Sequence, residues 1–376
     1  MSNPLILGTN SIKDSAYNVA NSLRLESGSS DNLTRSQTSG NRNKATFSAW
    51  VKRSKLGANQ GIFGIHGASS DAGQIEIRFQ SSGEGFHISG QATNWRRTNK
   101  NFRDTSAWQH LVVAFDTTLS TASDRVKVYV NGVQETSFAA SGDPSQDSDL
   151  PFGLSGATCS IGSNFNSGSA GEYFSGYLAE VVLIDGQQLD ATSFGEFDED
   201  SPTIWKPKDV SGLTFGTNGF YLDFENSSSL GADVSGNGNN FTVNNLTSVD
   251  QSTDTCTNNF ATLNPLYKQD GSFSEGNLQY TISSADFDSG VSTFGASSGK
   301  WYFETKITAQ SSEPTTRNAF GICDERDGNL IAEGEYGQNP TGRLGDTTGW
   351  SGNGSGNVLK NGSDQGSGFN KTYTTN

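Results

Sequence analysis

The chain has 376 residues, which allows two or three domains at roughly 100–200 residues each. Its formal net charge is −15, from 40 Asp and Glu against 25 Lys and Arg, which argues against nucleic acid and anionic membranes as partners. No apolar run approaches the roughly 18 residues of a membrane span, and no secretory signal is visible at the N-terminus. Charged residues are only 17%, so polarity comes mainly from Ser, Thr, Asn, Gln and Gly, as is typical of short strands joined by tight turns.

Apolar and β-branched residues alternate with turn clusters between about residues 22 and 185, and long helical periodicity is absent. The clearest hairpin signal is Arg125–Val130 followed by Asn131-Gly132, because this dipeptide tolerates the two positive-φ positions of a tight turn. A short helix is predicted at Asp190–Phe197, with Asp190 as N-cap. The predicted strands are Ser22–Glu26, Thr46–Arg53, Gly61–His66, Gln74–Gln80, Gly85–Ser89, Trp108–Phe115, Arg125–Val130, Val133–Phe138, Ala157–Ile161 and Tyr173–Ile184.

Composition shifts divide the chain into four segments. Residues 1–20 are expected to form an N-terminal anchor or arm, and residues 21–197 an antiparallel β-sandwich. Residues 198–276 are predicted to be a linker with a small β segment. Residues 277–376 form a second strand-rich region, with strands expected at Lys300–Thr308 and Asn318–Cys323. The three cysteines, at positions 159, 256 and 323, are odd in number and far apart, so we expect free thiols.

Four motifs in the first region carry a family resemblance. They are Thr46-Phe-Ser-Ala-Trp-Val51, Trp108-Gln-His-Leu-Val-Val113, Val128-Tyr-Val-Asn-Gly132 and Phe174-Ser-Gly-Tyr-Leu-Ala-Glu-Val-Val-Leu-Ile-Asp185. In this order and spacing the region resembles a laminin-G-like domain of the concanavalin A-like lectin type. The resemblance implies an all-β fold, an antiparallel jelly-roll β-sandwich whose two sheets are packed face to face.

The last region resembles the opening of a SPRY domain, another β-sandwich. Gly299-Lys-Trp-Tyr-Phe-Glu-Thr-Lys-Ile307 and Ala319-Phe-Gly-Ile322 carry this likeness. Because a SPRY fold needs further strands, the second sandwich is expected to be incomplete within this sequence.

The combination of modules resembles virion appendage proteins of tailed phages, notably marine ones. This resemblance implies a non-enzymatic fibre protein of the virion, assembled in the host cytoplasm. It would be held to other virion proteins by its N-terminal segment and would bind host-surface glycan. A homotrimer is expected by analogy with fibres. Two alternatives stay open: a capsid or tail decoration protein without glycan binding, and a laminarinase-type glycoside hydrolase.

The hydrolase alternative depends on the acidic run that contains Glu196, Asp198 and Asp200. On a strand, three carboxylates at alternate positions share one face, as retaining glycosidases require. However, the run follows the last predicted sandwich strand, and we favour a solvated inter-domain segment. The three histidines, His66, His87 and His110, lie in separate strands, and a structural role is favoured for His110.

The only basic and aromatic concentration spans residues 95–103 and offers a ligand-binding hypothesis. Its candidate binding residues are Trp95, Arg96, Arg97 and Phe102, which would stack on and hydrogen-bond a sugar. The competing interpretation is a charged edge strand that blocks edge pairing. Calcium is the one metal that the sandwich resemblance implies, at loop rims. Its candidate ligands are Asp71, Asp143, Asp147, Asp233, Asn237 and Asn239, although Asx and Gly turns explain the loop at 233–239 equally well.

Overall fold

In the computed structural model the fold of the chain is almost entirely β, with 42% of residues in strands and 4% in helices. The chain consists of two compact units, one of Gly8–Phe260 and one of Met1–Leu7 with Ala261–Asn376. No helix among the described residues is long and apolar enough to cross a membrane. The structure describes residues 17–67, 73–90, 93–166, 169–268, 271–281, 290–295, 298–306, 308–309, 319–322, 350–353, 358–360 and 363–364.

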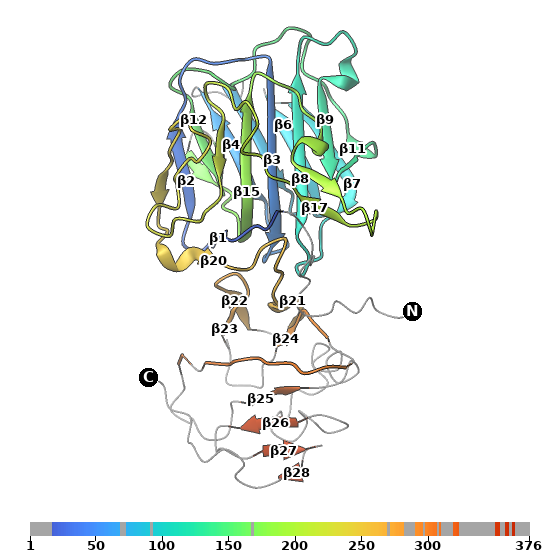
Figure 1. Ribbon diagram of the computed structural model, residues 1–376, viewed down its shortest axis with the longest axis vertical. Helices are drawn as coiled ribbons and strands as arrows, with labels where there is room; N and C mark the ends of the chain where they lie inside the picture. The colour runs from blue at the N-terminus through green and yellow to red at the C-terminus, as the bar shows by residue number, and fades with distance from the viewer. Residues whose placement is uncertain are drawn as a thin grey trace. The chain divides into compact units, whose positions relative to one another are not determined.

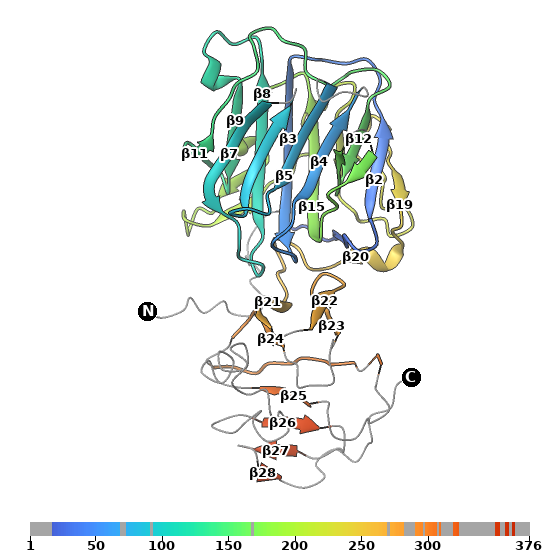
Figure 2. The ribbon, with the colours of Figure 1, turned by 180° about the vertical axis from the view of Figure 1, so that it is seen from behind.

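Two antiparallel sheets, named sheet A and sheet B here, build the unit Gly8–Phe260 (Figures 1 and 2). Sheet A has the order β10 (Val133–Gln134), β9 (Val126–Val130), β8 (Gln109–Asp116), β3 (Lys44–Arg53), β15 (Gly176–Asp185), β1 (Ser22–Leu25) and β20 (Gln251–Ser252), and β18 (Phe220–Leu222) also pairs with β15. Sheet B has the order β11 (Phe138–Ala140), β7 (Thr93–Asn101), β6 (Gly85–Gly90), β5 (Gln74–Phe79), β4 (Gln60–His66), β12 (Thr158–Ile161), β2 (Asn32–Ser36) and β19 (Thr242–Asn244). The predicted antiparallel sandwich is therefore confirmed.

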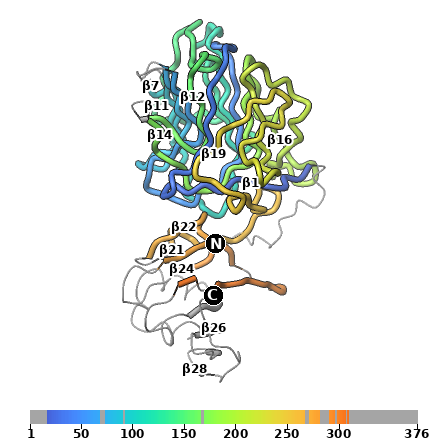
Figure 3. Tube along the Cα trace, turned by 90° about the vertical axis from the view of Figure 1, so that its left-hand side faces the viewer, coloured from blue at the N-terminus to red at the C-terminus, as the bar shows by residue number. Residues whose placement is uncertain are grey.

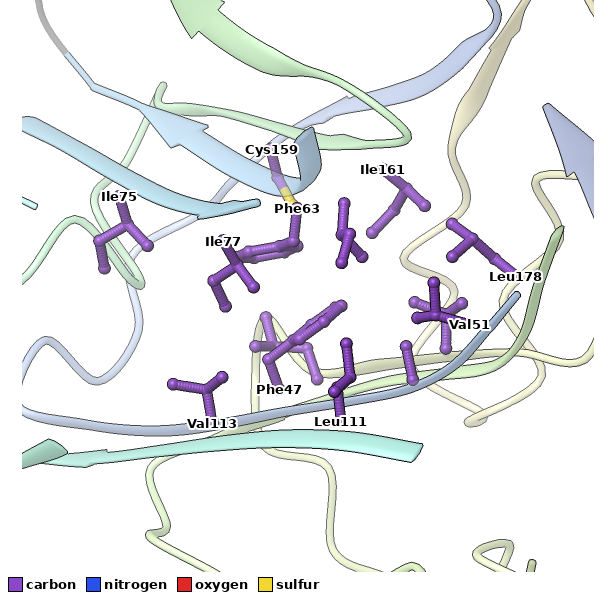
Figure 4. Packing of buried hydrophobic residues seen from close by; sticks show 14 of the residues in the cluster. Phe47, Val51, Phe63, Ile75, Ile77, Leu111, Val113, Cys159, Ile161 and Leu178 are labelled. Atoms are coloured by element: carbon purple, nitrogen blue, oxygen red, sulfur yellow. The ribbon is translucent and has the colours of Figure 1, made fainter. Parts of the chain in front are cut away.

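The main core fills the space between the sheets because side chains alternate along each strand. In β3, Phe47, Ala49 and Val51 face this core, where Phe47 stacks on Phe63 of β4 at 4.7 Å between ring centroids. Figure 4 shows Phe47, Val51, Leu111 and Val113 from sheet A opposite Phe63, Ile77 and Cys159 from sheet B. The Cys159 thiol is free and fully buried, and burial raises its pKa to about 12.

A second apolar layer covers the outer face of sheet A. Alternate residues of its central strands, including Trp50, Val112 and Val182, pack there against Phe194, Trp205 and Phe215. This cover consists of η3 (Ala191–Ser193), the hairpin of β16 (Gly195–Phe197) and β17 (Trp205–Pro207), and the chain up to residue 221. Seen from the side, β16 lies on the opposite side of the unit from β7 and β12 (Figure 3). Both faces of sheet A are therefore buried, which explains why its central strands are apolar on both sides.

The strand β15 keeps apolar residues on both faces by means of a bulge. Its pairing with β3 shifts register between Ala179 and Val182, and Glu180 there has a left-handed φ of 49°. The extra residue lets Ala179 face the outer layer while Val181 faces the core.

The linker predicted for residues 198–276 is wrong over most of its length, because residues up to Phe260 belong to the first unit. Three short strands hold this segment to the sandwich: β18 pairs with β15, β19 with β2, and β20 with β1. The helix predicted at Asp190–Phe197 is only the single turn η3, although Asp190 caps it as expected by accepting from the Thr192 amide. The hairpin turn at Asn131-Gly132 is confirmed, with φ of 48° and 79°.

The other unit contains short antiparallel pairings. A strand was predicted at Lys300–Thr308, but the described residues of this range form none. The strand predicted at Asn318–Cys323 is present as β25 (Ala319–Ile322). The SPRY-like character of this unit stays a prediction. The remaining elements are β21 (Leu263–Lys268) with β24 (Gly290–Ser292), β22 (Ser272–Ser274) with β23 (Gln279–Thr281), and the sheet β25 (Ala319–Ile322), β26 (Trp350–Asn353), β27 (Val358–Lys360) and β28 (Ser363–Asp364). In the first unit, the smaller elements are β13 (Asn164–Asn166), β14 (Ser169–Gly171), η2 (Ala122–Asp124) and η4 (Ser248–Asp250).

Candidate functional site

A pocket of about 250 Å³ opens at one end of the sandwich, where strands of both sheets terminate. We call it the rim pocket. The loop that follows β7 forms one wall, and the ends of β3, β5 and β8 with the β9–β10 turn form the rest. Its lining residues are Val51, Arg53, Phe79, Lys100, Asn101, Phe102, Arg103, Asp104, Ala107, Gln109 and Asn131.

Arg53 organises the wall of the rim pocket. This last residue of β3 is buried, and its guanidinium lies 4.3 Å from the centroid of the Phe79 ring. One terminal nitrogen donates to the carbonyl of Phe102 at 2.7 Å, and the other contacts Glu84 at 2.8 Å and Gln60 at 3.1 Å. Burial lowers the pKa of Arg53, and Glu84 opposes this effect. Because the Phe102 carbonyl is bound to a rigid strand end, the loop after β7 is held in place.

Polar groups and cations surround the mouth of the pocket. The Asn131 amide nitrogen donates to Gln109 at 3.0 Å, and its oxygen accepts from the His110 backbone at 2.7 Å. Lys100 and Arg103 are exposed, and the Lys100 ammonium lies 5.6 Å from the centroid of the Phe102 ring. The pocket thus combines apolar walls with amides and cations, which is the mixture that polar small molecules and sugars need.

The structure separates the four residues of the predicted binding cluster, and only Phe102 lies in the pocket. Trp95 is 1% exposed in the main core, so it is not available to stack on a sugar. Arg96 is also buried, and it binds Asp143 at 2.7 Å and the Trp95 carbonyl. Arg97 lies directly opposite His87 in the pairing of β7 with β6, on the face of sheet B that points away from the main core. The physical reason is a register shift between β6 and β7, which turns Trp95 inward.

The carboxylates of Glu196, Asp198 and Asp200 do not form a catalytic face. The strand β16 ends at Phe197, and the Asp198 carboxylate accepts from the backbone of Asp200 and Ser201 in the turn that follows. Lys206 lies 3.5 Å from Glu196 and 3.4 Å from Asp198. The backbone hydrogen bond from Ser201 is the main reason that the pKa of Asp198 is lowered, the opposite of what a general acid needs. This acidic run is largely exposed to solvent, as predicted, but it lies within the first unit and not between domains.

His110 has a structural role on the outer face of sheet A. The Trp205 indole donates to its Nδ1 at 3.0 Å, so Nε2 carries the proton and donates to the Ser48 hydroxyl at 2.9 Å. Its ring also stacks on Trp50, at 4.8 Å between centroids. Burial lowers the pKa of His110 to about 3, so the ring stays neutral.

The outer face of sheet B is polar and partly closed by the β13–β14 hairpin. Arg78 binds Glu172, the residue that follows β14, at 2.6 Å and donates to His87 Nδ1 at 3.2 Å. Burial, followed by the charge of Arg78, lowers the pKa of His87 to about 4. The absence of a side chain at Gly61 is required, because a Cβ there would lie 2.5 Å from the Asn164 backbone nitrogen.

The loop around Asp233 does not fit a calcium ion as it stands. Both Asp233 oxygens accept hydrogen bonds from the loop, among them one from the Asn239 backbone at 2.7 Å. The Asn239 oxygen accepts from Arg35, and the amides of Asn237 and Asn239 donate to the carbonyl of Gly219. These are the hydrogen bonds of a turn. Asp71 lies outside the described residues, and among the described part of the chain no three His, Cys, Asp or Glu side chains are grouped to hold a metal.

Comparison with known proteins assigns the fold of the first unit. Residues 27–191 match the family model Laminin_G_3, of the concanavalin A-like lectin/glucanases superfamily. A search of the curated proteins finds no match.

Several solved structures are similar to parts of the chain. A candidate carbohydrate-binding protein from Bacteroides ovatus is 16% identical, with a TM-score of 0.39, over 61% of this chain and 59% of that one. A heptameric SAP-like pentraxin from Limulus polyphemus is 18% identical, with a TM-score of 0.36, over 46% of this chain and 80% of that one. The CBM40 of a Ruminococcus gnavus IT-sialidase, bound to α2,3-sialyllactose, is 12% identical, with a TM-score of 0.29, over 39% of this chain and 85% of that one. The chain therefore spans less than two thirds of the first of these structures.

The family match ends at residue 191, whereas the compact unit continues to Phe260. Residues 192–260 therefore add the outer layer and the short edge strands to a smaller matched sandwich. The match and the two-sheet architecture together support a concanavalin A-like lectin/glucanase domain in the first unit of this chain.

Proposed function

We propose that the first unit is a non-enzymatic saccharide-binding module and that the rim pocket is its binding site. The observation that carries this proposal is the convergence of Phe102, the Gln109 amide and exposed cations on one pocket of a concanavalin A-like domain. Its volume of about 250 Å³ is below the roughly 300–1,000 Å³ of drug-sized ligand sites, which favours one sugar ring as occupant.

The lining of the pocket argues against hydrolysis at this site. Glycosidases use two carboxyl groups that flank the bond they cleave, and Asp104 is the one carboxylate among the lining residues. Its Oδ1 already accepts from the backbone and the hydroxyl of Ser106, at 2.8 and 2.6 Å. A pocket with this lining holds a ligand without the acid and base pair that would cleave it.

The substitution Ala107→Phe tests the site directly, since a phenyl ring there would fill the pocket. The affinity for glycans, measured on a glycan array and by calorimetry, is expected to fall at least tenfold. The matched control is Ala122→Phe, at an exposed alanine outside the pocket. Unchanged binding in Ala107→Phe with an unchanged melting temperature would place the site elsewhere. Release of reducing ends from laminarin, lost on Glu196→Gln, would instead support the hydrolase alternative.

We further propose that the chain acts as an appendage of a phage particle, attached by its N-terminal segment to other virion proteins. The support for this role is the resemblance of its module order to such proteins. Many weak sites on one particle would give strong attachment to host glycan through avidity. Light scattering on the purified protein tests the expected trimer, and a particle reconstruction tests attachment. Capsid association without any glycan affinity would favour the decoration alternative.

A further inference from the structure

The charge of the rim pocket differs in sign from the charge of the chain. Three cationic side chains, Arg53, Lys100 and Arg103, line the pocket beside a single carboxylate, Asp104. The whole chain has 40 acidic and only 25 basic residues, so this local excess is not what the composition would produce on average. Arg53 is paired with Glu84, so the exposed charges of the pocket are two cations, Lys100 and Arg103, called the rim cations here, and the carboxylate of Asp104.

The two rim cations have no ion-pair partner among the described residues. The Lys100 ammonium lies 5.6 Å from the centroid of the Phe102 ring. Both side chains are exposed to solvent. Lys100 and Arg103 are therefore available to an external anion.

Arg53 adds a donor in the pocket wall. Its side chain is 3% exposed, and its Nε has no hydrogen-bond partner among the described residues. A buried N–H group without a partner is unfavourable, because it loses its hydrogen bonds to water. The Nε atom is itself buried, so Arg53 shapes the wall of the pocket, and Lys100 and Arg103 are the cations that a ligand can reach.

We infer that the rim pocket selects a sugar residue that carries a negative charge, held by Lys100 and Arg103 at the mouth. This inference rests on the proposed saccharide function of the same pocket. The planar guanidinium of Arg103 suits a carboxylate or a sulfate, with which it forms paired hydrogen bonds. The apolar walls contact the ring of the sugar, and the amides of Gln109 and Asn131 contact its hydroxyl groups.

The experiment compares matched oligosaccharides that differ only in charge, by calorimetry with the full chain. The probes are a galacturonate trimer and its methyl ester, an alginate trimer and its methyl ester, and a carrageenan tetrasaccharide before and after desulfation. The carboxylate and sulfate arms separate the two sources of negative charge. We expect at least one anionic probe to bind about tenfold more tightly than its neutral partner, which corresponds to about 1.4 kcal/mol. High salt should weaken this preference.

The double substitution Lys100→Gln with Arg103→Gln is expected to remove the preference for the anionic probe. Both residues are exposed, so the melting temperature should not change. Lys208→Gln removes one exposed positive charge outside the pocket and should leave the preference intact. Equal binding of charged and neutral probes, both weakened by Ala107→Phe, would overturn the charge selection and keep the saccharide function. Failure of every probe to bind would overturn both.

Discussion

The substitution Glu180→Gln is expected to shift the stability of the first unit in favour of the variant as the pH rises from 5 to 8. Glu180 lies at the bulge of β15 and is 6% exposed. Its carboxylate accepts from the hydroxyls of Tyr17 at 2.7 Å and Tyr221 at 2.8 Å. Burial outweighs these two hydrogen bonds and, with the nearby charges of Asp223 and Glu225, raises the pKa of Glu180 from 4.5 to about 7.

The magnitude follows from the difference between the two pKa values. Below pH 4.5 the carboxyl group is protonated in the folded and the unfolded chain, and its contribution to stability is fully present. As the pH rises toward 7, the unfolded chain ionises first, so this contribution is lost. From 4.5 to about 7, at about 1.36 kcal/mol per pKa unit, the total loss is about 3 kcal/mol. Glutamine does not titrate and avoids this loss.

The assay is urea denaturation of the wild type and Glu180→Gln at pH 5 and pH 8. Comparing the same two proteins at both values cancels the constant effect of altered hydrogen bonds to Tyr17 and Tyr221. The stability difference should shift in favour of the variant by roughly 2–3 kcal/mol between pH 5 and pH 8. The matched control is Glu199→Gln, which removes a carboxylate at an exposed position. A difference between wild type and Glu180→Gln that does not depend on pH would refute the reasoning.

Two further substitutions test the packing of the first unit. Asp254→Ala should destabilise the first unit by about 3 kcal/mol or more, because Asp254 lies 2.7 Å from the buried ammonium of Lys52. Adding Lys52→Met should recover part of this loss. Chemical denaturation measures both variants, and an effect of Asp254→Ala below about 1 kcal/mol would contradict the buried ion pair. Gly61→Ala should lower the free energy of unfolding by roughly 1–3 kcal/mol, because its Cβ would meet the backbone of β13. The control Gly212→Ala should be neutral, because a Cβ there has no atom within 4 Å. Equal melting temperatures of these two variants would contradict the close approach at Gly61.

The strands of the sandwich centre were predictable because their residues alternate regularly. Phe47, Ala49 and Val51 in β3 and Leu111, Val113 and Phe115 in β8 face the core as period two requires. The strand β2, with the sequence Asn-Leu-Thr-Arg-Ser, has a single apolar residue and gave no such signal. The strands β18, β19 and β20 have only two or three residues each, so the sequence predicts a linker with a small β segment there and not the pairing of these strands with the sandwich.

The candidate site was predictable only in part, because its residues come from distant parts of the sequence. Phe102 was expected from the aromatic and basic cluster, and Asn131 was noted only as a turn residue. Arg53, Gln109 and Ala107 join them through the meeting of strand ends, for which the sequence carries no local pattern. The orientation of Trp95 depends on the register shift between β6 and β7, which single-sequence periodicity does not show.

The pairing of β1 with both β15 and β20 has a consequence for synthesis on the ribosome. The first strand of the sandwich meets its neighbours only when residues 176–178 and 251–252 have emerged, and β2 likewise waits for β12 and β19. Until then the edges of β1 and β2 stay open to other chains. A nascent chain of this protein therefore exposes unpaired strand edges, at which pairing with other chains can begin, until about residue 260 has emerged.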